Sequence, residues 1–462
     1  MTQIATLVYA IAILGLVFLD RQRGVRTSKA LWLPIVWFWI AGSRAVSVWL
    51  NIQPADRADQ YLEGSPLDRY VALAMMIVGV IVLLSRGTRI RQLFRANKPV
   101  VAFLLYCAVS TAWSDYPDVS FRRWIKMLGD FTMILVVLTD REPTAALKRV
   151  LARAAFVLLP VSVLLIKYYP AIGRYWGHWE GKAFYGGVAT DKNMLGKTCL
   201  IFGLGASWRV LQEMAGSRRA RILMAQGSIV AIALWLFYTC NSMTSMSCFL
   251  LASGLMAAMT TFKAARQKAV VHALVLGVIV ICACTLFLGV GGDVLNTLGR
   301  DSTLTGRTQL WGELAGMTVN PVLGTGFESF WLGKRLQRLW AAHWWRPNES
   351  HDGYLELYLN LGLAGVGLFL VVLVTGYRNI MKLLPTDPEG GRIRLAFFVV
   401  GVTYNFTEAA TRSMDVVWLM LILSVIAIPA GRLSKTGREP VRESLNGLAV
   451  EGAVAPEPLG VG

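Results

Sequence analysis

The chain has 462 residues, of which 55% are hydrophobic and only 16% are charged, and its mean hydropathy is +0.51. Soluble globular proteins average roughly 45–50% apolar and about 25% charged residues, so this composition excludes an ordinary soluble domain. A net charge of +18 would suggest nucleic-acid binding in a soluble protein, but here the basic residues lie in short loops between apolar runs, which is typical of membrane topology.

Apolar runs close to the length that a bilayer requires, about 20 residues, predict about thirteen spanning helices. They are expected near residues 3–19, 31–49, 70–85, 99–113, 122–139, 150–167, 193–211, 222–239, 243–262, 270–289, 353–377, 394–410 and 414–430. Basic loops alternate with acidic or neutral loops along the whole series, as the positive-inside rule requires. The sequence therefore predicts an all-α, polytopic membrane helix bundle of about 12–13 transmembrane helices with a large helical external loop.

The apolar runs divide the chain into four predicted regions. Residues 1–289 are expected to form an N-terminal transmembrane bundle, and residues 290–351 a large external loop. Residues 352–430 are expected to form the C-terminal transmembrane helices. Residues 431–462 are rich in Gly, Pro and charge, so we expect a disordered cytoplasmic tail there.

The external loop contains a predicted helix over residues 307–319, with Thr305 or Ser302 as its N-cap. One face of this helix is apolar at helical spacing and includes Leu310, Trp311, Leu314 and Met317. The dipeptide "NP" then ends the helix, and "GTG" at residues 324–326 predicts a turn. We expect this amphipathic helix to lie across the outer mouth of the bundle.

Arg307 stands in the first turn of that helix, where the positive helix end disfavours a cation by up to about 1 kcal/mol. A residue placed against its local preference suggests another task. Together with the free N–H groups of the turn, Arg307 would make a strong site for an anion such as phosphate. The alternative is an exposed arginine that forms an ion pair with Asp301 or with a lipid headgroup. The sequence does not decide between the anion site and this ion pair.

His351 precedes the apolar run at 353–377, and either Ser350 or Asp352 is expected to cap the helix that begins there. A neutral imidazole at this position can accept a proton from a sugar hydroxyl. The alternative is a polar histidine at the membrane interface with no chemical role.

Other polar residues are predicted on the same outer side, which the alternating loop charges define. Glu408 and Arg412 lie at the outer end of the twelfth predicted helix, and Lys192 and Asn193 begin the seventh. Arg174 lies in the outer loop before it. Ionisable residues within membrane segments are functional candidates by default, and their convergence on one side strengthens the prediction of a site.

Four segments together resemble the O-antigen ligase and polysaccharide polymerase superfamily. They are "GGVATDKNMLGK", "GRTQLW…NPVLGTGFESF", "NESHDGYLELYLNLGLAGVGLFL" and "YNFTEAATRSMD". The resemblance covers roughly residues 180–420, and the "TDKN" motif is similar to that of the exopolysaccharide-polymerase branch.

This resemblance implies a multi-pass glycosyltransferase of the GT-C type in the bacterial inner (plasma) membrane, with its active site facing the periplasm. It implies an undecaprenyl-pyrophosphate-linked glycan as donor and a glycan or the lipid A core as acceptor, among membrane lipids and with a chain-length regulator as a further partner. It places the family's catalytic arginine and histidine on Arg307 and His351. No nucleic acid, cofactor or metal is expected.

The second cationic group of the family falls on Lys192 in "TDKN" or on Arg174, and the sequence leaves this choice open. We expect Arg307 to stabilise the departing pyrophosphate and His351 to take the acceptor's proton, with inversion at the anomeric carbon. Glu408 is expected to hold His351 or the acceptor, while Asn348, Asn193 and Arg412 are expected to bind substrate. A rival hypothesis is a transporter or flippase for the lipid-linked oligosaccharide, although such a protein should place polar groups near the membrane midplane.

Overall fold

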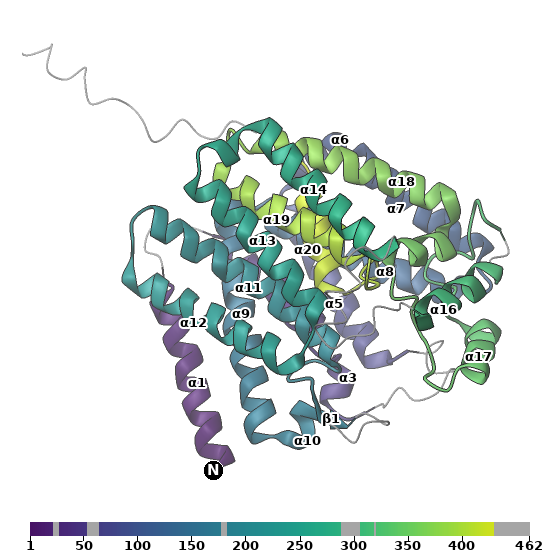
Figure 1. Ribbon diagram of the computed structural model, residues 1–462, viewed down its shortest axis with the longest axis horizontal. Coiled ribbons are helices and arrows are strands. Elements are labelled where there is room, and N and C mark those ends of the chain that lie inside the picture. The colour runs from purple at the N-terminus through teal and green to yellow at the C-terminus, as the bar shows by residue number, and fades with distance from the viewer. Residues whose placement is uncertain (22–26, 53–63, 177–182, 288–304, 318–319, 429–462) are drawn as a thin grey trace, which may run out of the picture. The chain divides into compact units, whose positions relative to one another are not determined.

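The computed structural model describes residues 1–21, 27–52, 64–176, 183–287, 305–317 and 320–428, and these ranges are almost entirely helical (Figure 1). The helices are α1 (Thr2–Leu19), η1 (Lys29–Leu31), α2 (Trp32–Ala41), α3 (Val46–Trp49), α5 (Pro66–Leu84), α6 (Gly87–Ala96), α7 (Lys98–Ser110), η2 (Thr111–Trp113), α8 (Pro117–Leu138), α9 (Pro143–Tyr168), α10 (Pro170–Gly173), α11 (Lys192–Ala215), α12 (Ala220–Cys240), α13 (Met243–Thr261), η3 (Ala264–Arg266), α14 (Lys268–Phe287), α16 (Thr305–Gly316), α17 (Gly333–Ala342), α18 (Gly353–Leu383), α19 (Pro388–Tyr404) and α20 (Val416–Val425). Strands β1 (Arg174–Trp176) and β2 (Ala183–Tyr185) pair as one antiparallel hairpin.

The predicted all-α polytopic membrane fold is confirmed, and each predicted span is helical over most of its length. In the described part of the chain, six helices are long and apolar enough to cross a membrane, and the bent pair α6 and α7 would make a seventh. Fewer described helices meet this requirement of length and hydropathy than the 12–13 spans predicted from the sequence. The helices α8, α11 and α19 carry several charged residues, and α2 and α20 are only 10 residues long.

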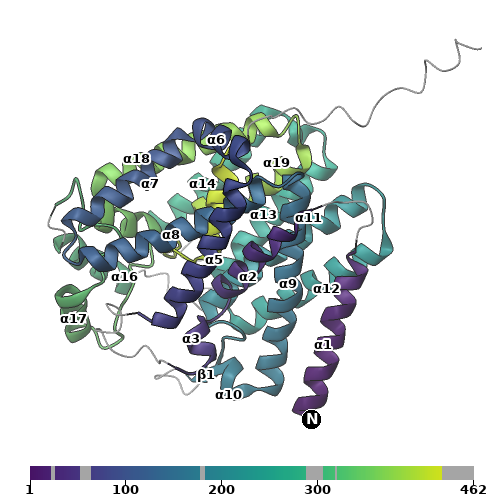
Figure 2. The same ribbon diagram turned by 180° about the vertical axis from the view of Figure 1, so that it is seen from behind.

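Helix α11 lies at the centre of the bundle and packs against α9, α12, α13 and α20. Its residues from Leu195 to Arg209 are almost all buried, which is possible because the segment is apolar and rich in small residues. Helix α1 lies at the rim against α9 and α12, while α7 and α18 run side by side in both views (Figures 1 and 2).

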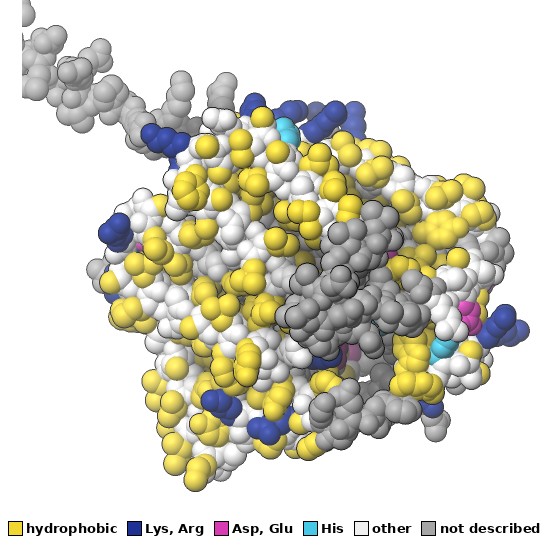
Figure 3. Space-filling view, viewed as in Figure 1, with side chains coloured by type: hydrophobic (Ala, Val, Ile, Leu, Met, Phe, Trp, Pro, Cys, Tyr) yellow, Lys and Arg dark blue, Asp and Glu magenta, His cyan; other side chains and the backbone are white. Residues whose placement is uncertain are grey.

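The outward-facing surface of several helices is hydrophobic. Large exposed side chains include Tyr238 on α12, Leu250 on α13, Ile281 on α14 and Leu370 on α18. Figure 3 shows hydrophobic side chains spread over one face, with Lys and Arg mostly toward its edges. An apolar face of this extent would be unfavourable in water, and it fits the lipid-facing surface of a membrane bundle.

Helix α18 is not the continuous helix that the sequence predicted over 353–377. It breaks at Gly362, which has a φ of 63°. The segment 321–326 fills the break with backbone hydrogen bonds: Leu363 N–H to Pro321 O (2.9 Å), Ala364 N–H to Val322 O (3.1 Å), Thr325 N–H to Leu359 O (3.1 Å) and Gly326 N–H to Asn360 O (2.8 Å). These bonds satisfy backbone groups that the break would otherwise leave unpaired inside the bundle.

The predicted helix over 307–319 is α16, which begins two residues earlier and ends at Gly316. Its predicted apolar face is confirmed, because Leu310 and Leu314 are fully buried and Trp311 and Met317 pack against the same cluster. The predicted turn at "GTG" is also present, with positive φ at Gly324 and Gly326. Residues 290–304 of the predicted loop and residues 431–462 of the predicted tail lie outside the described residues.

Candidate active site

Three helices around the candidate site each begin at an aspartate whose side chain caps them. Asp191 accepts hydrogen bonds from the backbone at the start of α11 (2.9 Å and 2.9 Å), and Asp352 does the same for α18 (2.8 Å and 2.9 Å). Asp415 caps α20 (2.8 Å and 3.4 Å). Such caps satisfy the unpaired N–H groups of a helix start and fix where each helix begins.

His351 stands immediately before the Asp352 cap, with a φ of 55°. This left-handed backbone is uncommon for a residue other than glycine, and strain of this kind concentrates at functional sites. The neighbouring Ser350 is buried, and both its backbone N–H and its backbone carbonyl are hydrogen-bonded to side chains. Its N–H donates to Glu356 Oε1 (2.6 Å), and its carbonyl accepts from Trp311 Nε1 of α16 (2.8 Å).

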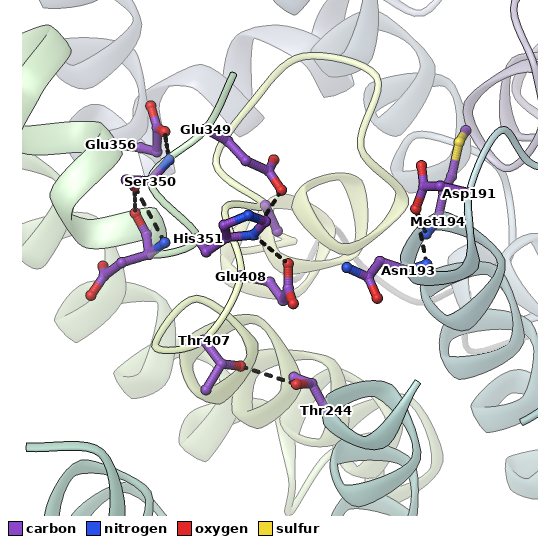
Figure 4. Close-up of polar contacts among 12 residues, drawn as sticks. Asp191, Asn193, Met194, Thr244, Glu349, Ser350, His351, Glu356, Thr407 and Glu408 are labelled. Carbon is purple, nitrogen blue, oxygen red and sulfur yellow. Dashed lines mark hydrogen bonds and ion pairs between the residues drawn. The ribbon is translucent and has the colours of Figure 1, made fainter. Parts of the chain in front are cut away.

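Two carboxylates face the same ring nitrogen of His351 (Figure 4). Nδ1 lies 3.3 Å from Glu408 Oε2 and 3.1 Å from Glu349 Oε1. The second oxygen of Glu349 is ion-paired with Arg412. Because ionised carboxylates only accept hydrogen bonds, this geometry favours the tautomer with the proton on Nδ1. In the neutral ring, Nε2 is then left as a proton acceptor, and the side chain is partly exposed.

The loop that carries Glu408 and Arg412 is fastened to the first residue of α18. Gly353 N–H donates to Asn405 O (2.8 Å), and Thr411 Oγ1 donates to Gly353 O (3.1 Å). A Cβ at Gly353 would lie only 2.0 Å from Asn405 Oδ1, so this close approach requires glycine. The approach brings Glu408 beside His351.

The other end of the same loop is also anchored. Both the N–H and the hydroxyl of Ser413 donate to Glu328 Oε1 (3.0 Å and 3.2 Å), and Met414 N–H donates to Asp130 Oδ2 (2.9 Å). Lys197 of α11 forms an ion pair with Asp415 (2.6 Å). Sequence reasoning did not single out Lys197, because its partner lies 218 residues away.

Lys192 and Asn193 begin α11 as predicted. In Figure 4 the side-chain amide of Asn193 points toward the side on which His351 and Glu408 lie. The Lys192 N–H donates to the hydroxyl of Tyr175 (3.1 Å), and its ammonium lies over the Phe184 ring. Burial raises the pKa of Tyr175, so that hydroxyl keeps its proton near neutral pH.

The remaining predicted residues fall in three different situations. Arg174 donates to Ile166 O (2.9 Å), stacks over Tyr185 and lines another cleft beside α12, so its described contacts do not join it to His351. Asn348 is exposed and lies three residues before His351. Arg307 lies in the first turn of α16, and its side chain is outside the described residues.

Glu349, His351 and Glu408 also form a group that could hold a metal ion, because one ligand atom from each lies within 4.8 Å of the others. Contact of Glu408 with His351 was one of two alternatives expected from the sequence, but the sequence did not predict that these two residues and Glu349 could together hold a metal ion. Arg412 already provides one positive charge there through its pair with Glu349. The cluster therefore has a balancing cation that belongs to the chain itself.

Comparison with known proteins finds no family model that matches the chain. The chain is 28% identical over 305 residues to the exopolysaccharide production protein ExoQ of Rhizobium meliloti (strain 1021). The aligned part covers 63% of this chain and 67% of that relative. This similarity supports the O-antigen ligase/exopolysaccharide-polymerase-like family that the sequence motifs predicted.

Proposed function

We propose that this protein is a membrane glycosyltransferase of exopolysaccharide production. It transfers a glycan from undecaprenyl pyrophosphate to a sugar hydroxyl at the periplasmic face of the bacterial inner membrane. The similarity to ExoQ supports the pathway. The single observation that carries the chemistry is the contact of His351 Nδ1 with Glu408, because it leaves Nε2 as a proton acceptor.

In the proposed reaction, the acceptor hydroxyl gives its proton to His351 Nε2 as its oxygen attacks the anomeric carbon. The bond between that carbon and the pyrophosphate oxygen breaks, and undecaprenyl pyrophosphate leaves with the electron pair. A single in-line displacement inverts the anomeric centre. Glu408 orients the imidazole and stabilises the imidazolium that forms, as the carboxylate does in a catalytic triad.

The departing pyrophosphate develops negative charge, and cations placed at that position lower the barrier. Arg307 is proposed as the first of them. It lies one helical turn before Trp311, which bonds to the carbonyl next to His351, so α16 ties this turn to the base. Lys192 at the start of α11 is proposed as the second cation in preference to Arg174, whose described contacts lie at another cleft. The transfer is proposed to need no metal or cofactor.

The acceptor is proposed to be another lipid-linked glycan, which makes the enzyme a polymerase, working with a chain-length regulator. A ligase that uses the lipid A core is the alternative within the same chemistry. Deletion of the gene distinguishes them: a polymerase mutant accumulates single repeat units, whereas a ligase mutant keeps long lipid-linked chains. The name of the relative, an exopolysaccharide production protein, favours the polymerase.

A lipid-linked oligosaccharide flippase is the second candidate, and the break in α18 favours it. Broken membrane helices occur at the substrate sites of many transporters. In this chain, however, backbone groups of the segment 321–326 fill the break, whereas the ionisable cluster lies at the start of the helix. This distribution of polar groups supports the transferase more than the flippase.

Complementation of a deletion strain tests the proposal. Arg307→Ala and His351→Ala should each abolish glycan production at normal protein levels. The first removes the cation that stabilises the departing pyrophosphate, and the second removes the base that accepts the proton of the acceptor hydroxyl. Near-normal glycan from a well-expressed double variant would contradict the proposed site.

A further inference from the structure

The Glu349 carboxylate is shared between two partners. Oε1 faces His351 Nδ1 at 3.1 Å, and Oε2 is bound to the Arg412 guanidinium. Glu408 faces the same ring nitrogen at 3.3 Å. The Nδ1–H is a single hydrogen-bond donor, and one carboxylate is enough to satisfy it. A second carboxylate on that nitrogen is therefore more than the orientation of His351 requires.

The two carboxylates differ in their surroundings. The Glu408 side chain is 9% exposed, whereas Glu349 is 19% exposed and Arg412 is 43% exposed. Glu408 is thus the enclosed partner of His351, and the pair of Glu349 and Arg412 forms the open side of the cluster. The backbone on both sides of Arg412 is fixed by Thr411 and Ser413, so its guanidinium can change partner without movement of the loop.

Resting on the proposed function, we propose that Arg412 binds the diphosphate of the donor, and that Glu349 occupies this guanidinium only while the donor is absent. A guanidinium presents the same fork of N–H groups to a carboxylate and to a phosphate, so the two anions can exchange at one place. A diphosphate carries more charge than a carboxylate and competes for the cation accordingly.

The exchange has a consequence for His351. A diphosphate on Arg412 removes the cation that neutralised Glu349 and places a new anion beside it, so the two repel each other. Glu349 then moves away, and Glu408 alone remains on Nδ1. Donor binding thereby leaves a single carboxylate to hold the Nδ1–H, while Nε2 stays the nitrogen that meets the acceptor hydroxyl.

The proposal differs from a purely structural ion pair in one measurable respect. If Arg412 serves only to neutralise Glu349, then Arg412 has no remaining task once Glu349 is neutral. If Arg412 binds the diphosphate, its removal weakens binding whether or not Glu349 is charged. A double-mutant cycle on binding separates these cases, because it isolates the dependence of one residue on the other.

The experiment measures binding of undecaprenyl diphosphate, which carries no sugar, to the purified full chain in detergent micelles. We expect Glu349→Gln to tighten binding by about tenfold, because it removes the competing anion, and Arg412→Gln to weaken it by about tenfold. In the Glu349→Gln background, Arg412→Gln should again weaken binding by at least about tenfold. Equal affinity of Glu349→Gln and of the double variant would overturn the proposal.

Two controls accompany the cycle. Arg338→Gln removes an exposed arginine of α17 and should leave binding unchanged, whereas an equal loss there would show that only net charge matters and would overturn the proposal. Arg412→Lys keeps the charge but loses the fork, so it should bind with intermediate affinity, and thermal unfolding verifies that each variant is folded. Because the probe has no glycan to transfer, the cycle reports on Arg412 even if the transferase activity proposed above fails its own test.

Discussion

Glu408 Oε2 lies 3.3 Å from His351 Nδ1, although 57 residues separate them in the sequence. The contact depends on two local features: the Asp352 cap, which fixes where α18 begins, and the Gly353–Asn405 bond, which fastens the second loop to that start. A neutral imidazole alone can carry its proton on either ring nitrogen. The contact with Glu408 selects Nδ1 for the proton and leaves Nε2 as the acceptor.

Glu408→Gln should lower the rate of glycan transfer at saturating donor by roughly 10²-fold or more, with little change in protein level. An amide keeps the size of the side chain but stabilises the imidazolium poorly and permits the wrong tautomer. The matched control is Glu142→Gln, which changes an exposed glutamate before α9 and should leave the rate unchanged. A rate for Glu408→Gln within twofold of the unmodified protein would show that the contact is not used.

Gly362→Ala should destabilise the protein by at least about 1–3 kcal/mol, because the residue has positive φ and a Cβ there would lie 2.2 Å from Val322 O. Gly367→Ala, in the same helix, provides the control, since its Cβ would meet no atom within 4 Å. Alanine should be neutral or slightly stabilising at that position. Thermal unfolding in detergent measures both, and equal melting temperatures would contradict the interlocked arrangement of α18 and the segment 321–326.

Local patterns predicted the helices and parts of the site. The spacing of Leu310 and Leu314 predicted the buried face of α16. Asp352, which caps α18, was one of the two caps expected there. Both predictions were possible because helical periodicity and capping depend on residues only a few positions apart. The break at Gly362 could not be predicted in this way. It depends on a segment some 40 residues earlier that supplies the missing hydrogen bonds.

Long-range contacts also limited the prediction of the site. The predicted topology placed Arg174 and His351 on the same outer side of the membrane. Two residues on one side of a membrane can still lie far apart, and Arg174 lines another cleft. The pairs Glu349–Arg412 and Lys197–Asp415 have no short-range signal, since their partners come from separate loops and helices. Arg307 stays a prediction from its motif and its place in α16.

Asn348→Cys should react with a membrane-impermeant maleimide in intact spheroplasts, because residue 348 is exposed and the loop charges predict a periplasmic position. Thr386→Cys, exposed in a loop predicted to face the cytoplasm, should react only after the membrane is permeabilised. The reverse pattern would place His351 on the wrong side for a periplasmic donor and would remove the basis of the proposed function.

Transfer by the purified protein should persist in excess chelator, although Glu349, His351 and Glu408 could together hold a metal ion. Arg412 supplies a positive charge at Glu349 while no donor is bound. Arg307, Lys192 and, in the donor complex, Arg412 are expected to supply the charge at the pyrophosphate. The assay compares rates before and after dialysis against chelator. Loss of activity that Mg²⁺ or Mn²⁺ restores would contradict this expectation.

The most direct test of the central claim is glycan transfer by the purified protein in detergent micelles, where no bilayer exists for a flippase to act across. We predict that a lipid-linked glycan donor is extended by the unmodified chain and that His351→Asn abolishes extension while the protein stays folded. Asparagine tolerates the left-handed backbone at residue 351 but cannot act as a base. Undiminished extension by His351→Asn, or no transfer by a folded unmodified protein supplied with donor and acceptor, would contradict the account.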